Sequence, residues 1–219
     1  MKPKFTRLTN QIFDYVCRHS SGAHIALLDQ LRAETEGLGE ISEMLIGKDQ
    51  GSFMSMLVSS IGAKSAFEIG TFTGYSATCI ALGLPEDGRL VCVDQSEEWT
   101  RIARRYWKDA GVTSKITLRL GDGKAVLRKL DRDEMFDFAF IDADKPGYDT
   151  YYELLLPHMR SNGVLLFDNM LRNGAVVKPA QGDENAKAVS ALNEKLASDP
   201  RVDSVLLTIG DGVNFCRKK

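Results

Sequence analysis

The sequence predicts an α/β fold in which a mostly parallel sheet is covered by helices on both faces. From Lys64 onward, short apolar runs alternate with amphipathic segments, and Gly, Asp or Pro bounds each run. The runs are 66–69, 90–93, 116–120, 136–141 and 164–167, and the amphipathic segments lie near 74–83, 97–109, 123–130 and 147–160. Buried parallel strands joined by helices have this pattern, so we expect right-handed βαβ units and a doubly wound sheet.

The two ends of the chain differ from this alternating part. A helix near 184–198 precedes two apolar runs, 202–209 and 213–216, which Gly210-Asp211-Gly212 separates, and this pattern predicts a terminal antiparallel hairpin. The first sixty residues have helical spacing, and a further helix is predicted to begin near Asp49. We therefore expect one domain over 1–219, with N-terminal helices over 1–62 and the sheet core over 63–219.

Composition excludes several classes of protein. The chain has 219 residues, 43% of them apolar and 26% charged, and its net charge of −2 argues against binding nucleic acid or an anionic membrane surface. It contains no apolar run long enough to span a membrane and no signal-peptide pattern at its N-terminus. The four cysteines are scattered without a C-x-x-C pair, so we expect no zinc site or disulfide framework and a reducing, cytoplasmic location.

Two predicted strand ends favour an adenosine-type ligand. Gly70 and Gly74 follow the first strand and allow a tight turn, but the spacing matches neither common phosphate-binding pattern. Glu68 before this turn suits a cationic ligand, and Asp94 at the end of the second strand suits a ribose. The alternatives are an ordinary strand-to-helix turn and, for Asp94 or Ser96, a helix cap.

A sharper feature follows the fourth and fifth strands. Asp142-Ala143-Asp144-Lys145 and Asp168-Asn169 would bring Asp142, Asp168 and Asn169 together as oxygen ligands. Such ligands suit Mg²⁺ or Ca²⁺ better than zinc. Helix capping explains one such site easily and two neighbouring sites less easily. The basic and aromatic stretch 99–108 could suggest nucleic acid, but acids lie nearby and a solvated helix face is favoured.

Together these residues resemble the cation-dependent class I O-methyltransferases, the group of caffeoyl-CoA and catechol O-methyltransferases, and especially its small bacterial members. The resemblance covers nearly the whole chain. Its specific pieces are Asp49-Gln50-Gly51, Glu68 to Ser76, Pro85-Glu86-Asp87-Gly88, Asp142-Ala143-Asp144-Lys145, Asp168-Asn169, Asn173-Gly174 and Gly210-Asp211-Gly212. The resemblance implies a Rossmann-like methyltransferase sheet and S-adenosylmethionine as cofactor.

The resemblance also implies a role for each matching residue. The cofactor would be bound by Glu68, Gly70, Thr71 and Ser76 of the first turn, by Asp94 at the ribose, by Gly123 near the adenine, and by Met44, Ile46, Asp142 and Asp144. Asp142, Asp168 and Asn169 match the metal ligands, with Mg²⁺ expected and Ca²⁺ or Mn²⁺ as alternatives. Lys145 matches the general base, so Lys145 and Asp142 are the expected catalytic residues, and Lys145 and Asn173 would contact substrate.

The expected reaction moves a methyl group from S-adenosylmethionine to one hydroxyl of a vicinal dihydroxyaromatic small molecule that a divalent cation chelates. An alternative acceptor is a natural-product precursor such as a hydroxylated aromatic amino acid derivative. The plant enzymes have Trp at the position of Arg172 and a longer stretch at 178–184, so the acceptor stays open. The resembled family also implies a homodimer formed with the N-terminal helices.

Three other classes of protein are less well supported. A nicotinamide-dependent oxidoreductase would need the missing G-x-G-x-x-G pattern. A nucleic-acid methyltransferase is opposed by the charge and, for amino-methylating enzymes, by the lack of a Pro-Pro-aromatic motif after the fourth strand. A scaffold without catalysis would not require Lys145 together with the three oxygen ligands.

Overall fold

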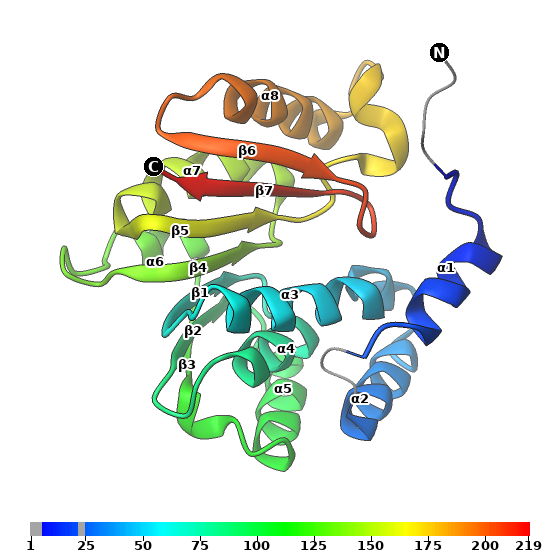
Figure 1. Cartoon of the computed structure of the whole chain (residues 1–219), viewed down its shortest axis with the longest axis vertical. Helices are drawn as coiled ribbons and strands as arrows, with labels where there is room; N and C mark the ends of the chain where they lie inside the picture. The colour runs from blue at the N-terminus through cyan, green and yellow to red at the C-terminus, as the bar shows by residue number, and fades with distance from the viewer. Residues whose placement is uncertain (1–5, 22–24) are drawn as a thin grey trace.

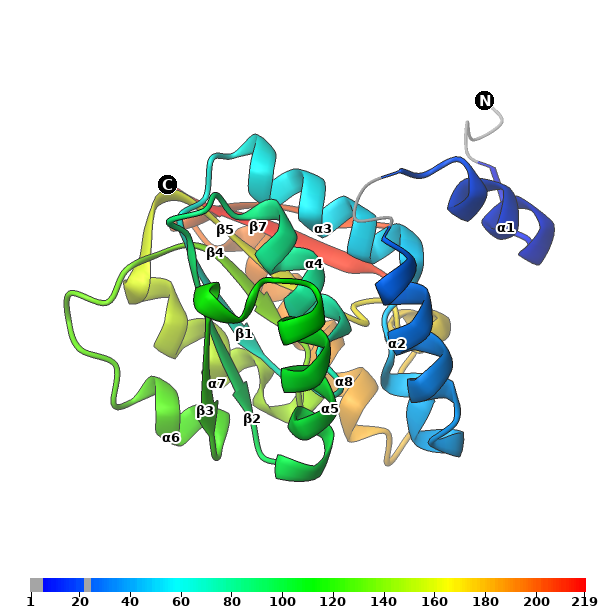
Figure 2. The same ribbon diagram turned by 90° about the horizontal axis from the view of Figure 1, so that it is seen from below.

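The computed structural model describes residues 6–21 and 25–219, and it confirms the predicted fold class. One seven-stranded sheet is covered by helices (Figures 1 and 2), and its strand order is β3-β2-β1-β4-β5-β7-β6. The strands are β1 Ser65–Ile69, β2 Arg89–Asp94, β3 Ile116–Leu120, β4 Phe136–Ile141, β5 Met159–Phe167, β6 Val202–Leu207 and β7 Val213–Lys218. β1 to β5 pair in parallel, and β7 is antiparallel to both β5 and β6.

The α-helices of the described residues fall into an N-terminal group and a group that connects the strands. Their bounds are α1 Asn10–Arg18, α2 Ala26–Glu36, α3 Lys48–Ser60, α4 Tyr75–Gly83, α5 Glu97–Asp109, α6 Gly123–Leu127, α7 Tyr148–Leu155 and α8 Glu184–Ser198. A 3₁₀ segment, η1 Gly39–Met44, joins α2 to α3. α1 lies at the periphery in both views, and parts of the predicted helical region, 1–5 and 22–24, fall outside the described residues.

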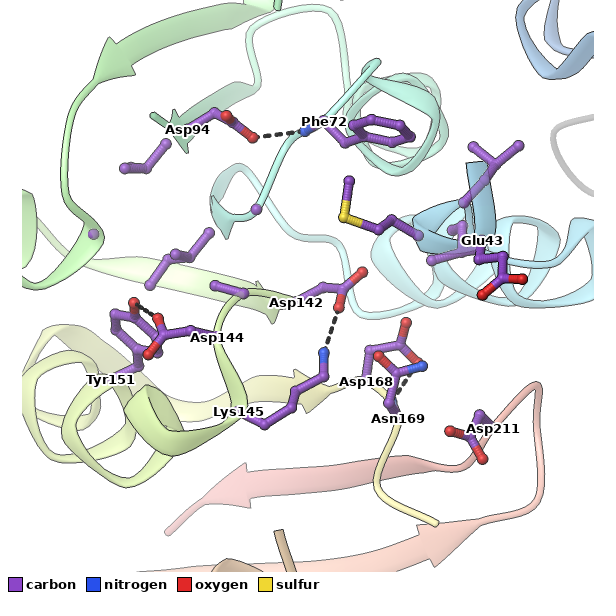
Figure 3. A pocket seen from close by; sticks show the side chains of 18 of the residues that line it. Glu43, Phe72, Asp94, Asp142, Asp144, Lys145, Tyr151, Asp168, Asn169 and Asp211 are labelled. Carbon is purple, nitrogen blue, oxygen red and sulfur yellow. Dashed lines mark hydrogen bonds and ion pairs between the residues drawn. The ribbon is translucent and has the colours of Figure 1, made fainter. Parts of the chain in front are cut away.

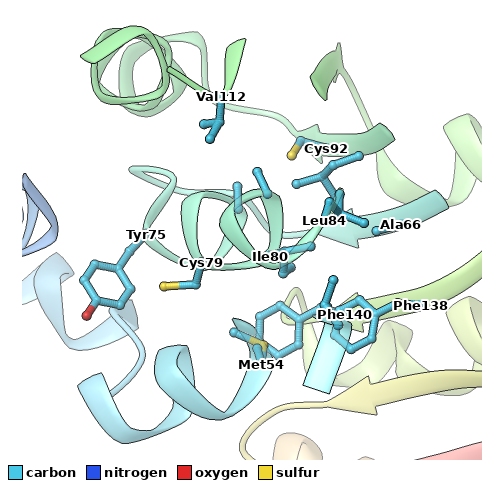
Figure 4. Close-up of a cluster of buried hydrophobic side chains, with 14 of the residues drawn as sticks. Met54, Ala66, Tyr75, Cys79, Ile80, Leu84, Cys92, Val112, Phe138 and Phe140 are labelled. Carbon is cyan, nitrogen blue, oxygen red and sulfur yellow. The ribbon is translucent and has the colours of Figure 1, made fainter. Parts of the chain in front are cut away.

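Successive side chains of each strand point to opposite faces of the sheet, so the core has two layers. Phe138 and Phe140 of β4 pack with the layer that contains α3, α4 and α5, whereas Ala139 and Ile141 pack with the layer that contains α7 and α8. Figure 4 shows the first layer, in which Met54 and Ile80 lie against the two phenylalanines. Both faces of the strand are therefore buried, which explains its continuous apolar sequence.

Several element ends differ from the sequence prediction. β5 begins at Met159, although the apolar run begins at Val164, because exposed polar residues 160–162 hide the start of the strand in the sequence. The helix predicted over 147–160 ends at Leu155, and a 3₁₀ turn containing Pro157 follows it. The helix predicted over 123–130 ends at Leu127. In the terminal hairpin β6 ends at Leu207 rather than at 209, so residues 208–212 form a longer loop than a simple Asp-Gly turn.

Backbone hydrogen bonds continue past the ends of the parallel strands and align the residues that follow them. The N–H of Gly70 donates to the carbonyl of Val93 (2.9 Å), and that of Asp142 donates to Ile69 (2.8 Å). The N–H of Asp168 likewise donates to Ile141 (3.1 Å). The residues after β1, β4 and β5 consequently stand side by side at the point where the strand order reverses, which is where open α/β sheets bind ligands.

The structure also bears on membrane-spanning helices and on the cysteines. Within the described ranges, no helix is long and apolar enough to cross a membrane. All four cysteines are free thiols, and Cys79, Cys92 and Cys216 are buried.

Candidate active site

A cavity of about 980 Å³ opens at the carboxyl ends of β1, β2, β4 and β5. Its volume suits a drug-sized ligand together with a small second molecule. Of the residues predicted for the site, those that line the cavity are Met44, Ile46, Gly70, Asp94, Gly123, Asp142, Asp144, Lys145, Asp168 and Asn169. These residues come from both halves of the chain and line one cavity.

The turn after β1 is shaped by glycine and held by Asp94. Gly70 has a φ of 90°, and a Cβ atom there would collide with the carbonyl oxygen of Asp142, so only glycine lets the ends of β1 and β4 approach. Asp94 Oδ2 accepts hydrogen bonds from the N–H groups of Thr71 (3.0 Å) and Phe72 (2.8 Å). Asp94 Oδ1 accepts from the N–H of Ser96 (2.7 Å). Asp94 thus organises the turn and also lines the cavity.

Three residues predicted to bind the cofactor lie behind this turn rather than on the cavity wall. Glu68 is 0% exposed, Thr71 1% and Ser76 7%. Burial raises the pKa of Glu68 to about 7, and the nearby hydroxyls of Ser76 and Thr71 oppose that rise. Neither carboxyl oxygen of Glu68 accepts a hydrogen bond of normal geometry from the described residues. Direct contact between these side chains and the cofactor stays a prediction.

The wall on the β2 side is aromatic, a feature that the sequence did not indicate. Phe72 and Trp99 both line the cavity, and their rings meet edge to face with centroids 5.1 Å apart. Opposite them, Met44 and Ile46 come from the segment before α3, and the carbonyl of Ile46 accepts a hydrogen bond from Arg32 Nη2 (2.5 Å). Flat apolar surfaces of this kind suit an adenine ring and its ribose.

At the next strand end, Asp144 connects α6 and α7. Its carboxylate accepts hydrogen bonds from the Tyr151 hydroxyl and from Lys124 Nζ (3.4 Å). A Cβ at Gly123 would lie 2.9 Å from Ile69 Cγ2 and 3.1 Å from Tyr151 Cε1, so this glycine keeps the floor of the cavity open. Asp144 therefore has a structural role besides any contact with the cofactor.

An acidic centre lies where β4 and β5 end, and Figure 3 shows Asp142, Lys145, Asp168 and Asn169 converging there. Lys145 Nζ donates to Asp142 Oδ1 (2.8 Å) and to the hydroxyl of Tyr148 (2.7 Å). That hydroxyl donates in turn to the carbonyl of Asp168 (3.2 Å). The Asp168 carboxylate is 3% exposed and accepts from the N–H of Asn169 (2.7 Å).

The electrostatics of this centre fit a cation. Burial and the neighbouring charge of Asp142 raise the pKa of Asp168 above its usual range, although Lys145 opposes the rise. Carboxylate and amide oxygens without sulfur or imidazole are the donors that hard divalent cations take. No three His, Cys, Asp or Glu side chains are grouped to hold a metal in the described part of the chain, so Asn169 would have to supply the third ligand.

Asn173, predicted to contact substrate, is exposed and lies just outside the cavity lining. Its N–H donates to Asp211 Oδ1 (2.6 Å), which joins the loop after β5 to the terminal hairpin. Residues that sequence reasoning did not assign to the site also line the cavity: Glu43, Gln50, Phe72, Trp99, Tyr151, Arg172, Asn185 and Asp211. Gln50 and Asp211 belong to the motif pieces Asp49-Gln50-Gly51 and Gly210-Asp211-Gly212 that carry the resemblance, and this was the signal available for them.

The sequence of this chain is similar to those of known O-methyltransferases. The sequence matches the O-methyltransferase family over residues 18–219. It is 36% identical to caffeoyl-CoA O-methyltransferase of Populus kitakamiensis over 206 residues, which cover 90% of this chain and 88% of that protein. The match thus extends over nearly all of both chains.

Solved structures agree with the sequence match. The O-methyltransferase TomG of Streptomyces achromogenes, involved in tomaymycin synthesis and crystallised with SAM, has a TM-score of 0.87 at 27% identity, with 96% of each chain covered. An O-methyltransferase of Bacillus cereus in complex with SAH has a TM-score of 0.87 at 29% identity and covers 95% of this chain and 97% of its own.

The sheet order and the cavity at its switch point define a Rossmann-like, S-adenosylmethionine-dependent methyltransferase. More particularly, the chain belongs to the O-methyltransferase family and is an enzyme of the caffeoyl-CoA type.

The buried Glu68 makes the stability of the cofactor-free enzyme depend on pH. Because its pKa is about 7 in the fold and near 4.5 in the unfolded chain, the folded state binds the proton more tightly. The unfolding free energy should fall as pH rises from about 4.5 to 7 and then level off. Glu68→Gln removes this ionisation, so its stability relative to wild type should rise over that range by on the order of 3 kcal/mol.

Chemical denaturation at pH 5 and pH 8 measures this difference, and Glu86→Gln, on the exposed surface, serves as the matched control. A gap between Glu68→Gln and wild type that stays constant with pH would show that Glu68 does not titrate in this way.

Proposed function

We propose that the enzyme transfers the methyl group of S-adenosylmethionine to one hydroxyl of a vicinal dihydroxyaromatic small molecule, with the help of a divalent cation. The observation that carries this proposal is the pairing of Asp142 and Asp168 with Asn169 beside Lys145 on one cavity wall. The aromatic and glycine-lined end of the same cavity is the proposed cofactor subsite. A hydroxylated natural-product precursor fits the same chemistry, and the structural neighbour TomG is involved in tomaymycin synthesis.

We propose Asp142, Asp168 and Asn169 as the ligands of the cation, with Mg²⁺ as the expected ion. When bound, the cation would hold both vicinal oxygens and lower the pKa of the attacking hydroxyl. The buried Asp168 is suited to this role because burial beside a second carboxylate favours a positive neighbour. Asp142 would serve both the cation and the ion pair with Lys145, which fixes the amine against the reacting hydroxyl.

In the proposed step Lys145 acts as the general base. Before the step, the ion pair between Asp142 and Lys145 would compete with the cation for the Asp142 carboxylate, and this competition favours loss of the ammonium proton to solvent. The neutral Nζ then takes the proton of the attacking hydroxyl while the oxygen–methyl bond forms and the sulfur–methyl bond breaks, which turns the sulfonium into a thioether. Tyr148, whose hydroxyl contacts both Lys145 and the backbone of Asp168, fixes the position of the amine. The segment with Met44 and Ile46 would cover the cofactor and exclude water.

Removal of the metal tests the role of the cation. With EDTA the methylation of a vicinal diphenol should be lost and should return when Mg²⁺ is added, because the acceptor hydroxyl is mostly neutral at pH 7 without it. Binding of S-adenosylmethionine, followed by calorimetry, should change little, because its subsite lies at the other end of the cavity. An isolated phenol should be a poor acceptor throughout. Full turnover by the metal-free enzyme would refute the proposal.

Substitution of Lys145 tests its role as the base. Lys145→Ala should lower kcat about 10²- to 10⁴-fold, the usual contribution of general-base catalysis, with cofactor affinity nearly unchanged. Lys145→Arg keeps the charge next to Asp142 but cannot release a proton, so it should be comparably slow. Lys129→Ala, on the exposed surface, is the control. A normal kcat for either Lys145 variant would remove this residue from the mechanism.

We further propose a homodimer that uses the N-terminal helices. Leu8, Tyr15 and Val16, in and next to α1, are large apolar side chains that are 54%, 57% and 39% exposed, and a second subunit would cover them. Sedimentation at micromolar concentration should give twice the mass of the chain, whereas a monomeric mass would contradict this assembly. The free thiols suit a cytoplasmic location, which cell fractionation would test.

A further inference from the structure

Arg172 lines the cavity at its acceptor end without a partner for its charge. Its guanidinium forms no ion pair with any described residue, and its Nε is buried without a hydrogen bond. Among the described residues, the other buried polar atom on the cavity wall without a hydrogen bond of normal geometry is Gln50 Nε2, and the Gln50 side chain already acts on the Asp168 carboxylate. Buried donors in native structures are nearly always satisfied, so Arg172 Nε indicates an acceptor atom that a ligand brings.

The backbone holds Arg172 in a fixed and costly conformation. Arg172, Asn173 and Gly174 have φ values of 47°, 52° and 87°, a region that Asn and Gly tolerate but that disfavours the side chain of Arg172. Hydrogen bonds to the terminal hairpin maintain the loop: the N–H of Leu171 donates to the carbonyl of Asp211 (2.9 Å), and that of Met170 donates to Gly212 (2.8 Å). Strain that the surroundings enforce in this way is typical of functional positions.

The charge of Arg172 lies on the side of the cavity where the reaction is proposed to occur. Arg172 follows Asn169 by one short turn, and its positive charge acts on the hydroxyl of Tyr148, the group that contacts Lys145. Two acids, Glu43 and Asp211, also line the cavity. Within the described residues neither acid forms an ion pair with Arg172: the Asp211 carboxylate accepts the N–H of Asn173, and Glu43 is exposed on η1 (Figure 3).

We infer that Arg172 selects acceptors that carry a carboxylate on the dihydroxyaromatic ring or its side chain. A guanidinium offers paired N–H donors that match the two oxygens of a carboxylate, and such charge-assisted bonds are the strong ones. The inference rests on the proposed function and specifies the acceptor: a dihydroxyphenyl carboxylic acid rather than a neutral or cationic catechol. Arg172 acts here as a specificity residue and takes no part in the transfer of the methyl group.

The test compares three acceptors that differ in one group: 3,4-dihydroxybenzoate, its methyl ester and 3,4-dihydroxybenzylamine, each with saturating S-adenosylmethionine and Mg²⁺. Caffeate and methyl caffeate repeat the comparison with a longer side chain. For wild type, kcat/KM should be at least about 10-fold higher for one or both acids than for the matching ester, mainly through KM. Arg172→Gln should bring the ratio of kcat/KM for each acid to kcat/KM for its ester close to one, mainly by raising KM for the acids.

Lys178→Gln is the matched control, because it removes the same charge from the next exposed basic position of the same loop, outside the cavity. It should keep the preference for the acids. Equal kcat/KM for acid and ester in wild type, a preference for the amine, or an equal loss for all acceptors in Arg172→Gln would overturn the inference while leaving the proposed function intact. If wild type methylates none of these acceptors, the proposed function fails as well.

Discussion

Repulsion between two carboxylates at neighbouring strand ends is the constraint on which the site depends. Backbone hydrogen bonds from Asp142 to Ile69 and from Asp168 to Ile141 fix both residues in the extended ladder, so neither can move away from the other. Asp168 is almost completely buried, and the positive side chain of Lys145 lies near both acids, lowering the pKa of Asp168 and pairing with Asp142. An arrangement of this kind costs stability without a cation and stabilises a bound one, which is characteristic of a functional site.

The rest of the cavity follows from the same convergence of strands. Gly70 lets the ends of β1 and β4 approach, and Asp94 then ties the glycine turn to the end of β2 through the backbone N–H groups of Thr71 and Phe72. The aromatic and glycine-lined end, which is the proposed cofactor subsite, is built from the turn after β1, the end of β2 and the segment before α3, whereas the proposed acceptor end is built from side chains of α3, the loop after β5 and the terminal hairpin. This difference explains how one scaffold can keep its chemistry while the acceptor changes among relatives.

Much of this could be predicted from the sequence because strand ends of a parallel sheet meet at one edge. The runs ending at Ile69, Ile141 and Phe167 were apolar and well bounded, so the acids after them could be placed together before any coordinates were known. The beginning of β5 could not be predicted from the sequence, because its polar residues 160–162 do not have the apolar pattern of a buried strand. Glu68 lies at the end of β1, Thr71 in the turn and Ser76 in the first turn of α4, and a linear motif does not distinguish a residue on the cavity wall from one behind it. Trp99 reaches the cavity through tertiary packing, for which the sequence gives no local signal. Phe72 lies inside a motif piece of the resemblance, and Arg172 differs from the plant enzymes, but neither observation shows that the side chain lines the cavity.

The central claim is that the two strand-end acids form one cation site together with Asn169. Calorimetric titration with Mn²⁺, a common substitute for Mg²⁺, measures this directly on the wild-type enzyme and on Asp168→Asn. We expect one saturable Mn²⁺ site per chain in the wild-type enzyme and the loss of this site in Asp168→Asn. Circular dichroism should show that the variant keeps the wild-type fold. Unchanged stoichiometry and affinity in Asp168→Asn would contradict the central claim.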